Sequence, residues 1–138
     1  MKELKTEALK ENLPEVIAFL DEQLEAADCP MKLQMKLDIA VEEIFVNIAN
    51  YAYPDGTGTA VMQVEMLSDP PTVEITFIDS GVPYDPLAKP DPDITLSANE
   101  RQIGGLGIFM VKKSMDDMKY QYLDGKNILT LIKRLVIT

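Results

Sequence analysis

The stretch Ile39-Ala40-Val41-Glu42-Glu43-Ile44-Phe45-Val46-Asn47-Ile48-Ala49-Asn50-Tyr51-Ala52-Tyr53 combines an apolar stripe with polar side chains at helical spacing. It predicts the second half of a long helix, because its apolar residues and those before it project within an arc of about 100°. The stripe consists of Leu33, Leu37, Ala40, Val41, Ile44 and Ile48. Beside it lie Glu43 and Asn47, one turn apart, with Asn50 alongside, where they can reach a site between helix and sheet. An isolated Glu-x-x-x-Asn pair is more often simply solvated, so the pair alone does not indicate a site.

Composition limits the classes of function open to this chain. With 138 residues we expect one domain, spanning residues 1–138. The chain has no histidine, which excludes Ser-His-Asp triads, histidine metal sites and phosphorylation on its own histidine. The formal net charge of −10 argues against direct binding of nucleic acid, whose phosphates need Lys and Arg. It suits a basic protein partner, or simply solubility.

The sequence also indicates a cytoplasmic protein without a membrane segment. No apolar run reaches the roughly 18 residues of a membrane span, and the charged N-terminus lacks the apolar core of a signal peptide. The single cysteine, Cys29, has no partner for an internal disulfide, as is typical of a reducing compartment.

The first part of the chain predicts a strand followed by two helices. Residues 3–9 alternate loosely and predict an edge strand. Asn12 is a candidate N-cap for the first helix. Pro30 starts the long helix, which should end near Tyr53 because Pro54-Asp55-Gly56 is a strong stop and turn signal.

Two pairs of strands follow, separated by a longer segment. The predicted strands cover residues 59–67, 72–78, 117–123 and 127–136. The second strand runs straight into Asp79-Ser80-Gly81-Val82-Pro83. A carboxylate at a strand end followed by glycine is a natural ligand position, because the backbone there can be approached closely. A plain Asp-Gly turn would give the same pattern.

The segment between the strand pairs ends in glycines. Residues 84–103 are rich in proline and acidic residues and show no period, which indicates a lid over a site or a disordered segment. Gly104-Gly105-Leu106-Gly107 then opens a third helix. Glycines at a helix N-terminus present free N–H groups that suit a phosphate, although they could equally form a hinge. The motif is neither a Walker sequence nor a dinucleotide fingerprint.

Four features in this order resemble the sequence boxes of the GHKL superfamily of ATP-binding domains. They are Glu43-x-x-x-Asn47, Asp79-x-Gly81-x-Pro83, Gly105-x-Gly107 opening a helix, and Thr130 in a terminal strand. The chain is most similar to the single-domain branch of anti-sigma factor serine/threonine kinases, because Gly-Gly-Leu-Gly-Ile followed by Ser114-Met115-Asp116 resembles their last glycine box and helix. The resemblance implies the Bergerat fold, an α+β two-layer sandwich. In this fold a mixed, mostly antiparallel sheet is covered on one face by three helices.

The resemblance also implies roles for individual residues. Asn47 would ligate Mg²⁺ through its side-chain oxygen, with phosphate and water completing the coordination shell. Glu43 would act as the general base on the attacking hydroxyl. Asp79 would accept a hydrogen bond from the adenine amino group, and Gly81 would let the backbone come close.

Other matched positions would serve the phosphates and the adenine. The glycine motif and its helix would hold the ATP phosphates. The residues in that motif are Gly104, Gly105, Leu106 and Gly107. Asn50 would extend the phosphate contacts, and Thr130 would support the adenine from the floor of the pocket.

Two positions depart from the branch. Tyr51 stands where relatives often have a histidine, at a position that is not usually catalytic. Many relatives have an arginine close to the glycine box that meets the terminal phosphate. Here Arg101 lies slightly upstream, and Lys112 or Lys113 are the alternatives.

The function implied is that of an ATP-dependent anti-sigma regulatory factor. Such proteins are homodimers that sequester a sigma factor and phosphorylate a serine or threonine on a STAS-type anti-anti-sigma antagonist. Glu43 favours a kinase, because a nucleotide sensor needs no base. The alternative is a non-catalytic module that binds ATP or ADP and regulates a partner by binding alone. The catalytic half of a split histidine kinase and an α+β domain without a nucleotide are further hypotheses.

Overall fold

Five strands form one sheet in the computed structural model, which describes residues 1–88 and 105–136. The strands are β1 (Lys2–Glu7), β2 (Thr59–Leu67), β3 (Thr72–Asp79), β4 (Asp117–Leu123) and β5 (Lys126–Arg134). Their order across the sheet is β1-β2-β3-β5-β4, and all four pairings between them are antiparallel.

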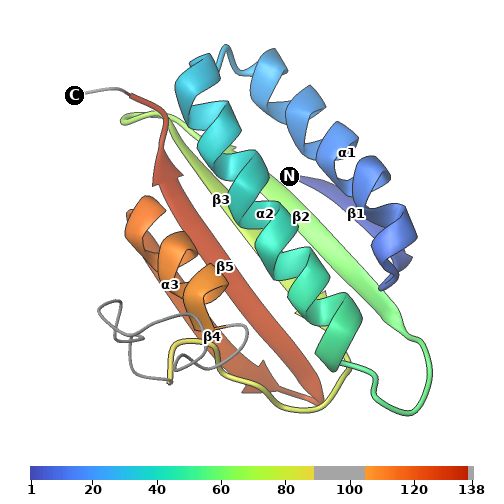
Figure 1. Cartoon of the computed structure of the whole chain (residues 1–138). Coiled ribbons are helices and arrows are strands. Elements are labelled where there is room, and N and C mark those ends of the chain that lie inside the picture. Colours follow the sequence, from blue (N-terminus) through green and yellow to red (C-terminus); the bar gives the residue numbers. More distant parts are fainter. Residues whose placement is uncertain (89–104, 137–138) are drawn as a thin grey trace.

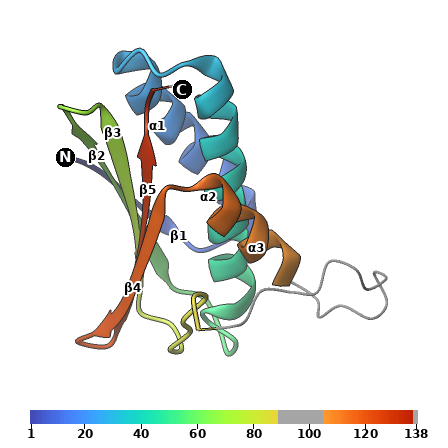
Figure 2. The ribbon, with the colours of Figure 1, turned by 90° about the vertical axis from the view of Figure 1, so that its left-hand side faces the viewer.

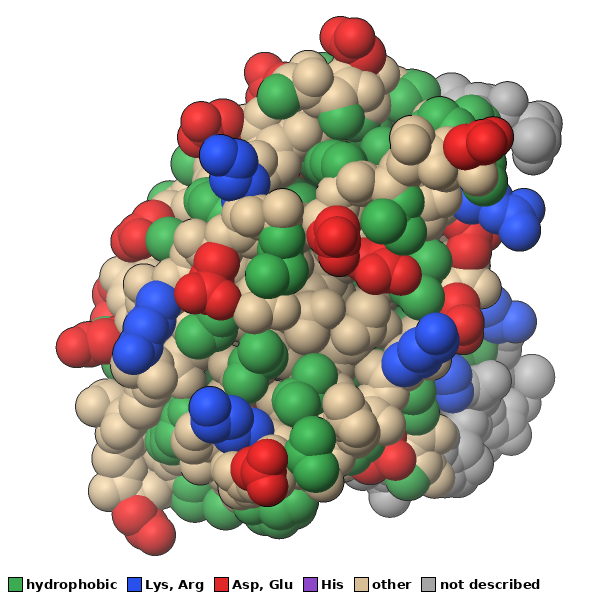
Figure 3. Space-filling view, turned by 180° about the vertical axis from the view of Figure 1, so that it is seen from behind, with side chains coloured by type: hydrophobic (Ala, Val, Ile, Leu, Met, Phe, Trp, Pro, Cys, Tyr) green, Lys and Arg blue, Asp and Glu red, His purple; other side chains and the backbone are tan. Residues whose placement is uncertain are grey.

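The α-helices of the described residues cover one face of this sheet, as the family resemblance implies (Figures 1 and 2). They are α1 (Leu13–Ala26), α2 (Met31–Tyr51) and α3 (Gly105–Ser114), and the short 3₁₀ helix η1 (Lys10–Asn12) leads into α1. The middle helix, α2, packs against both α1 and α3. Figure 3 shows the opposite side of the molecule, where hydrophobic side chains lie among charged ones.

The two-layer α+β architecture is confirmed. The sheet of the described residues is antiparallel throughout, which corrects the expectation that it is mixed. β3 and β4 run in the same direction, but β5 lies between them and is antiparallel to both. After β3, the connection through α3 places β4 two positions away from β3 in the sheet, so β3 and β4 form no parallel pair. The chain then turns back, and β5 occupies the position between them.

The predicted stripe on α2 is buried, and it anchors the helix on the sheet. It packs in one core cluster with alternate side chains of β3, which face the helices because strand side chains alternate between two faces. These β3 residues are Val73, Ile75 and Phe77. Phe45, which the predicted stripe did not include, is also fully buried. Burying one such aromatic side chain contributes roughly 1.5–3 kcal/mol, so the core fixes α2 over the middle of the sheet.

Most predicted boundaries agree with the structure within about two residues. Asn12 precedes α1 as expected, but it makes no capping bond and its Nδ2 donates to the Glu7 carbonyl oxygen at 3.0 Å. The predicted lid, residues 84–103, lies outside the described residues from position 89 onward, and residues 84–88 contain no helix or strand. None of the helices in the described chain has the length and apolar character that a membrane crossing requires.

Two carboxyl groups meet between α1 and α2. Asp21 and Asp38 each have one oxygen that is buried without a hydrogen-bond partner among the described residues. The pKa of Asp38 is raised to about 7, first by burial and then by the hydrogen bond and charge of Asp21 and the charge of Glu25. The folded protein therefore binds a proton here that an unfolded chain releases near the ordinary aspartate pKa of about 3.9.

Asp38 makes stability depend on pH. Its contribution is fully present below the unfolded pKa of about 3.9 and is lost as the pH rises through about 7, because only the folded protein holds the proton in that window. Asp38→Asn supplies an amide donor to Asp21 at any pH. We expect the variant to raise the free energy of unfolding by about 1–3 kcal/mol at pH 8 and to change it little at pH 4, measured by urea denaturation. Glu22→Gln, at an exposed position of α1, is the control, and an equal gain at both pH values would contradict the shared proton.

Candidate functional site

An apolar pocket lies between the second half of α2 and the sheet. It encloses about 460 Å³ of space outside the protein atoms, part of it open to solvent. Its apolar walls include Ile44, Ile48, Phe77 and Leu129, and its polar groups include Asn47, Asp79 and Asn127. An apolar wall with a few convergent polar groups is typical of a small-molecule site.

Asp79 is held in place at the end of β3. The residue is 7% exposed, and the β3–β5 register puts it opposite Asn127. Its Oδ1 accepts hydrogen bonds from the Gly81 N–H and from the Asn127 side-chain amide, both at 2.9 Å. Because both of these bonds fall on Oδ1, Oδ2 is the oxygen left to accept from a ligand. Asp79, which the resemblance suggests as the adenine acceptor, therefore lines the apolar pocket with this oxygen not used by those two bonds.

Asn127, which sequence reasoning missed, connects the segments around the pocket. Its Nδ2 donates to Asp79 and to the Val82 carbonyl oxygen, the latter at 2.9 Å. Its Oδ1 accepts from the Tyr84 N–H at 3.1 Å and from the Tyr120 hydroxyl. Burial is the main cause that raises the pKa of Tyr120, which keeps that hydroxyl a donor. An amide with two donors and two acceptor sites in use has one orientation, and it fixes the carboxylate beside it.

The turn after β3 lies directly on the end of α2. The Val82 N–H donates to the Ala52 carbonyl oxygen at 2.9 Å, and a side chain at Gly81 would collide with that same carbonyl group. The Tyr53 hydroxyl accepts a hydrogen bond from the Ser80 N–H at 2.8 Å, and burial raises the pKa of Tyr53. Glycine is thus required at position 81 for close backbone approach, as the Asp-x-Gly pattern predicts.

Glu43 reaches the first turn of α3. A side chain at Gly107, the third residue of α3, would collide with the Glu43 carboxylate, so the two residues are in contact. A carboxylate at this place meets the positive end of the helix dipole. Glu43 lines a second hollow, between α2 and α3, rather than the apolar pocket.

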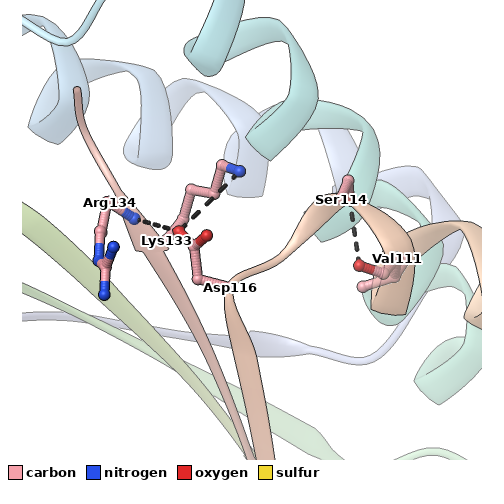
Figure 4. Close-up of polar contacts among 5 residues, drawn as sticks. All are labelled: Val111, Ser114, Asp116, Lys133 and Arg134. Carbon is pink, nitrogen blue, oxygen red and sulfur yellow. Dashed lines mark hydrogen bonds and ion pairs between the residues drawn. The ribbon is translucent and has the colours of Figure 1, made fainter. Parts of the chain in front are cut away.

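The other end of α3 is tied to β5. In the last turn the Ser114 hydroxyl donates to the Val111 carbonyl oxygen at 3.1 Å (Figure 4). Just after the helix, Asp116 Oδ2 accepts the Arg134 N–H at 2.7 Å and lies 3.9 Å from the Lys133 Nζ. These contacts anchor the C-terminal end of α3 on the sheet, while its glycine end meets α2.

The remaining predicted residues fall in three places. Asn47 lines the apolar pocket, one turn after Glu43. Asn50 is exposed on α2 and lines neither hollow. The first residues of α3 are Gly105 and Leu106. Outside the described residues lie Arg101 and Gly104.

The lysines suggested as alternatives for a terminal phosphate lie at the opposite end of α3 from the glycines. Lys112 and Lys113 belong to the last turn of α3, whereas the glycines form its first turn. The Lys113 ammonium group lies 5.5 Å from the centre of the Phe109 ring. Arg101 remains the candidate cation.

Thr130 lies outside the apolar pocket, which corrects its predicted place on the floor. The buried side chains of β5 at positions 127, 129 and 131 face the helices, so Thr130 points to the opposite face of the sheet. There its Oγ1 lies 3.1 Å from the Thr76 Oγ1. Leu129 and Asn127 occupy the place expected for Thr130.

These features agree with the comparison of the chain with known families. The sequence profile described as "Histidine kinase-like ATPase domain" matches residues 6–133. The chain therefore belongs to the histidine kinase-like ATPase domain family, which confirms the resemblance inferred from the sequence boxes.

Within that family, the chain is similar to bacterial protein kinases. The serine/threonine-protein kinase BtrW of Bordetella bronchiseptica is 29% identical over 100 residues, which cover 72% of this chain and 70% of the kinase. The serine-protein kinase RsbW of Listeria monocytogenes is 30% identical over 96 residues, which cover 67% of this chain and 60% of the kinase. The matched region thus spans less than two thirds of the Listeria kinase.

Solved structures share the fold at lower sequence identity. The crystal structure of the RsbU and RsbW domains of Rv1364c from Mycobacterium tuberculosis matches with a TM-score of 0.65 and 17% identity, covering 98% of this chain and 33% of that one. The histidine kinase domain of the blue-light activated kinase from Erythrobacter litoralis EL346 matches with a TM-score of 0.53 and 14% identity, covering 77% and 46%. These matches confirm the fold.

The contact between Gly81 and α2 predicts unequal effects of two glycine substitutions. Gly81→Ala places a methyl group against the Ala52 carbonyl, whereas a Cβ at Gly56 meets no atom within 4 Å. We expect Gly81→Ala to lower the free energy of unfolding by about 1–3 kcal/mol. Gly56→Ala should change it by less than about 1 kcal/mol. Urea denaturation of both variants measures this, and equal stabilities would show that the turn does not touch the helix.

Proposed function

We propose that this chain is an ATP-dependent protein serine/threonine kinase that acts as an anti-sigma regulatory factor. The observation that supports it is one arrangement of residues. Asp79 and Asn127 meet at the end of an apolar pocket, Asn47 lines that pocket, and Glu43 touches Gly107 on the glycine helix. The names of the similar kinases support the same activity.

The apolar pocket is the proposed site for adenine. Asp79 would accept the adenine amino group on Oδ2, with Asn127 holding the carboxylate in that orientation. Ile48 and Phe77 would contact the flat faces of the base. A base that lacks an amino group at this position would leave a buried acceptor unpaired, so the site would favour adenine.

The phosphates would lie toward the glycine helix. The N–H groups of the first turn of α3 are suited to bind them, with Arg101 contributing positive charge. The described residues contain no group of three or more His, Cys, Asp or Glu that could hold a metal. The single amide oxygen of Asn47 fits Mg²⁺, which keeps water and phosphate oxygens in most positions. Mg²⁺ bound there would neutralise part of the phosphate charge.

Glu43 would then act on the protein acceptor. Its carboxylate would take the proton of a serine or threonine hydroxyl as that oxygen forms a bond to the terminal phosphorus. The bond between this phosphorus and the bridging oxygen would break, and ADP would leave with the electron pair.

The proposed partners are proteins. They are a sigma factor that the chain sequesters, and a STAS-type anti-anti-sigma protein that carries the acceptor hydroxyl. Phosphorylation of the antagonist would switch the partner of this chain in the cytoplasm, where it would act as a homodimer in transcription regulation. The net charge of −10 supports contact with proteins rather than with nucleic acid.

One observation also suits the alternative of a non-catalytic ATP or ADP module. Glu43 lies at the N-terminal turn of α3, where a carboxylate stabilises a helix whether or not it acts as a base. In that case Glu43 would position α3 and regulation would follow nucleotide binding alone.

Substitution of Glu43 separates these two functions. We expect Glu43→Gln to lower phosphate transfer from labelled Mg·ATP to a small protein in an extract of the source cells by about 100-fold or more, because the base is lost. Affinity for ADP should not fall by more than about threefold, since Glu43 does not line the apolar pocket and its negative charge does not attract the phosphates. The matched control is Glu42→Gln, at the neighbouring exposed position. If the wild type binds nucleotide but labels no protein, the non-catalytic module is correct.

A second pair of variants tests the adenine end of the pocket. We expect Asn127→Leu to weaken ADP binding by tenfold or more, because Asp79 loses the amide that orients it. Thr130→Val should leave the affinity within about twofold, since Thr130 faces away from the pocket. Titration calorimetry with ADP measures both, after a thermal melt has shown that each variant is folded. Loss of affinity only in Thr130→Val would place the adenine elsewhere.

A further inference from the structure

The hollow between α2 and α3 is a groove with mostly apolar walls. It encloses about 930 Å³ of space outside the protein atoms, part of it open to solvent. Its walls include Ile39, Ala40 and Met110, with Lys36 and Glu43 as its charged groups. The space lies outside the apolar pocket, and the two share no lining residue within the described part of the chain.

Large apolar side chains along this groove are exposed. Ile39 is 58% exposed and Met110 is 56% exposed. The apolar surface continues along α2 through Met35 and Met31, which precede Ile39 by one and two turns and are 58% and 64% exposed. Single exposed apolar side chains are common on protein surfaces, but a group of them on one face indicates an interaction surface. Methionine suits such a surface because its unbranched side chain adapts to a partner.

Glu43 connects this groove to the proposed transfer site. Its carboxylate touches Gly107 in the first turn of α3 and lines the groove. Asn47, one turn further along α2, lines the apolar pocket instead. A hydroxyl group that gives its proton to Glu43 can therefore approach through the groove, while the nucleotide would approach from the pocket.

We propose that the groove between α2 and α3 binds the acceptor segment of the protein substrate, with an apolar side chain next to the acceptor hydroxyl seated between Ile39 and Met110. The inference rests on the proposed kinase function, since the hydroxyl is placed by its need to reach Glu43. The apolar walls specify the chemistry of the neighbouring side chain. Lys36 provides one cation in the groove, which suits an acidic residue elsewhere in the same segment.

The test compares Ile39→Gln and Met110→Gln with Leu123→Gln. Leu123 is a matched control, since it is 51% exposed at the end of β4 and lines neither hollow. The probe is the protein that wild-type enzyme labels in the extract assay, purified and phosphorylated at varied concentration with saturating Mg·ATP. We expect each groove variant to raise the KM for this protein about tenfold, because an apolar contact is lost. Leu123→Gln should keep the wild-type KM, and all three variants should bind ADP like the wild type.

The possible outcomes separate the two proposals. If the wild type binds Mg·ATP and labels no protein, the kinase function fails and the groove inference fails with it. If the wild type labels a protein but both groove variants keep the wild-type KM, only the groove inference fails. If the groove variants keep the wild-type KM but change the sedimentation mass, the groove is a contact between copies of the chain. In that last case the acceptor segment binds elsewhere.

Discussion

The hydrogen bond from the Val82 N–H to the Ala52 carbonyl oxygen fixes the end of α2 on the turn that follows β3. It can form because Gly81 has no side chain to hold the two backbone segments apart. Since α2 is a rigid helix of 21 residues, anchoring this end and burying its stripe sets the position of every side chain along it. Asn47 then lies on the wall of the pocket whose end carries Asp79. The pocket beside Ala52 and Val82 therefore depends on this close approach together with the buried stripe.

Side chains of α2 line the pocket, the groove and the core, because they project from the helix axis in different directions. Residues four apart differ by about 40° around the helix and by about 6 Å along it. This offset is sufficient for Asn47 to line the pocket and Glu43 to line the groove, while the apolar stripe beside them stays in the core. In the proposed function, a nucleotide and a protein acceptor would therefore approach the edge of α2 from two sides without competing for the same space.

Patterns that are local in sequence predicted the helices and hairpins well. The pairing of strands that are distant in sequence could not be predicted from such patterns. The helical period of α2 and the two hairpins come from short-range spacing, and the structure contains them. The order of the strands depends on how far the crossover through α3 carries the chain, which no local pattern specifies. β5 presents apolar residues to both faces, at 128 and 132 as well as at 129 and 131, so its orientation was ambiguous from the sequence. The family resemblance put Thr130 in the predicted site, and this ambiguous pattern gave no reason to prefer Asn127, whose role follows from its register opposite Asp79.

In the proposed function, the charges around Glu43 would favour an amide over a carboxylate at position 47. Glu43 and the nucleotide phosphates of the proposed function would both lie at the first turn of α3, where two anions repel each other. Lys36, the cation that the described residues place in the same groove, lies seven residues away on α2, about 10 Å along the helix. Balancing charge would have to come mainly from a metal ion held with the phosphates, and from Arg101. An aspartate at 47 would add a further negative charge to this site, whereas the amide oxygen of Asn47 would bind a hard cation and leave the full positive charge of the metal for the phosphates.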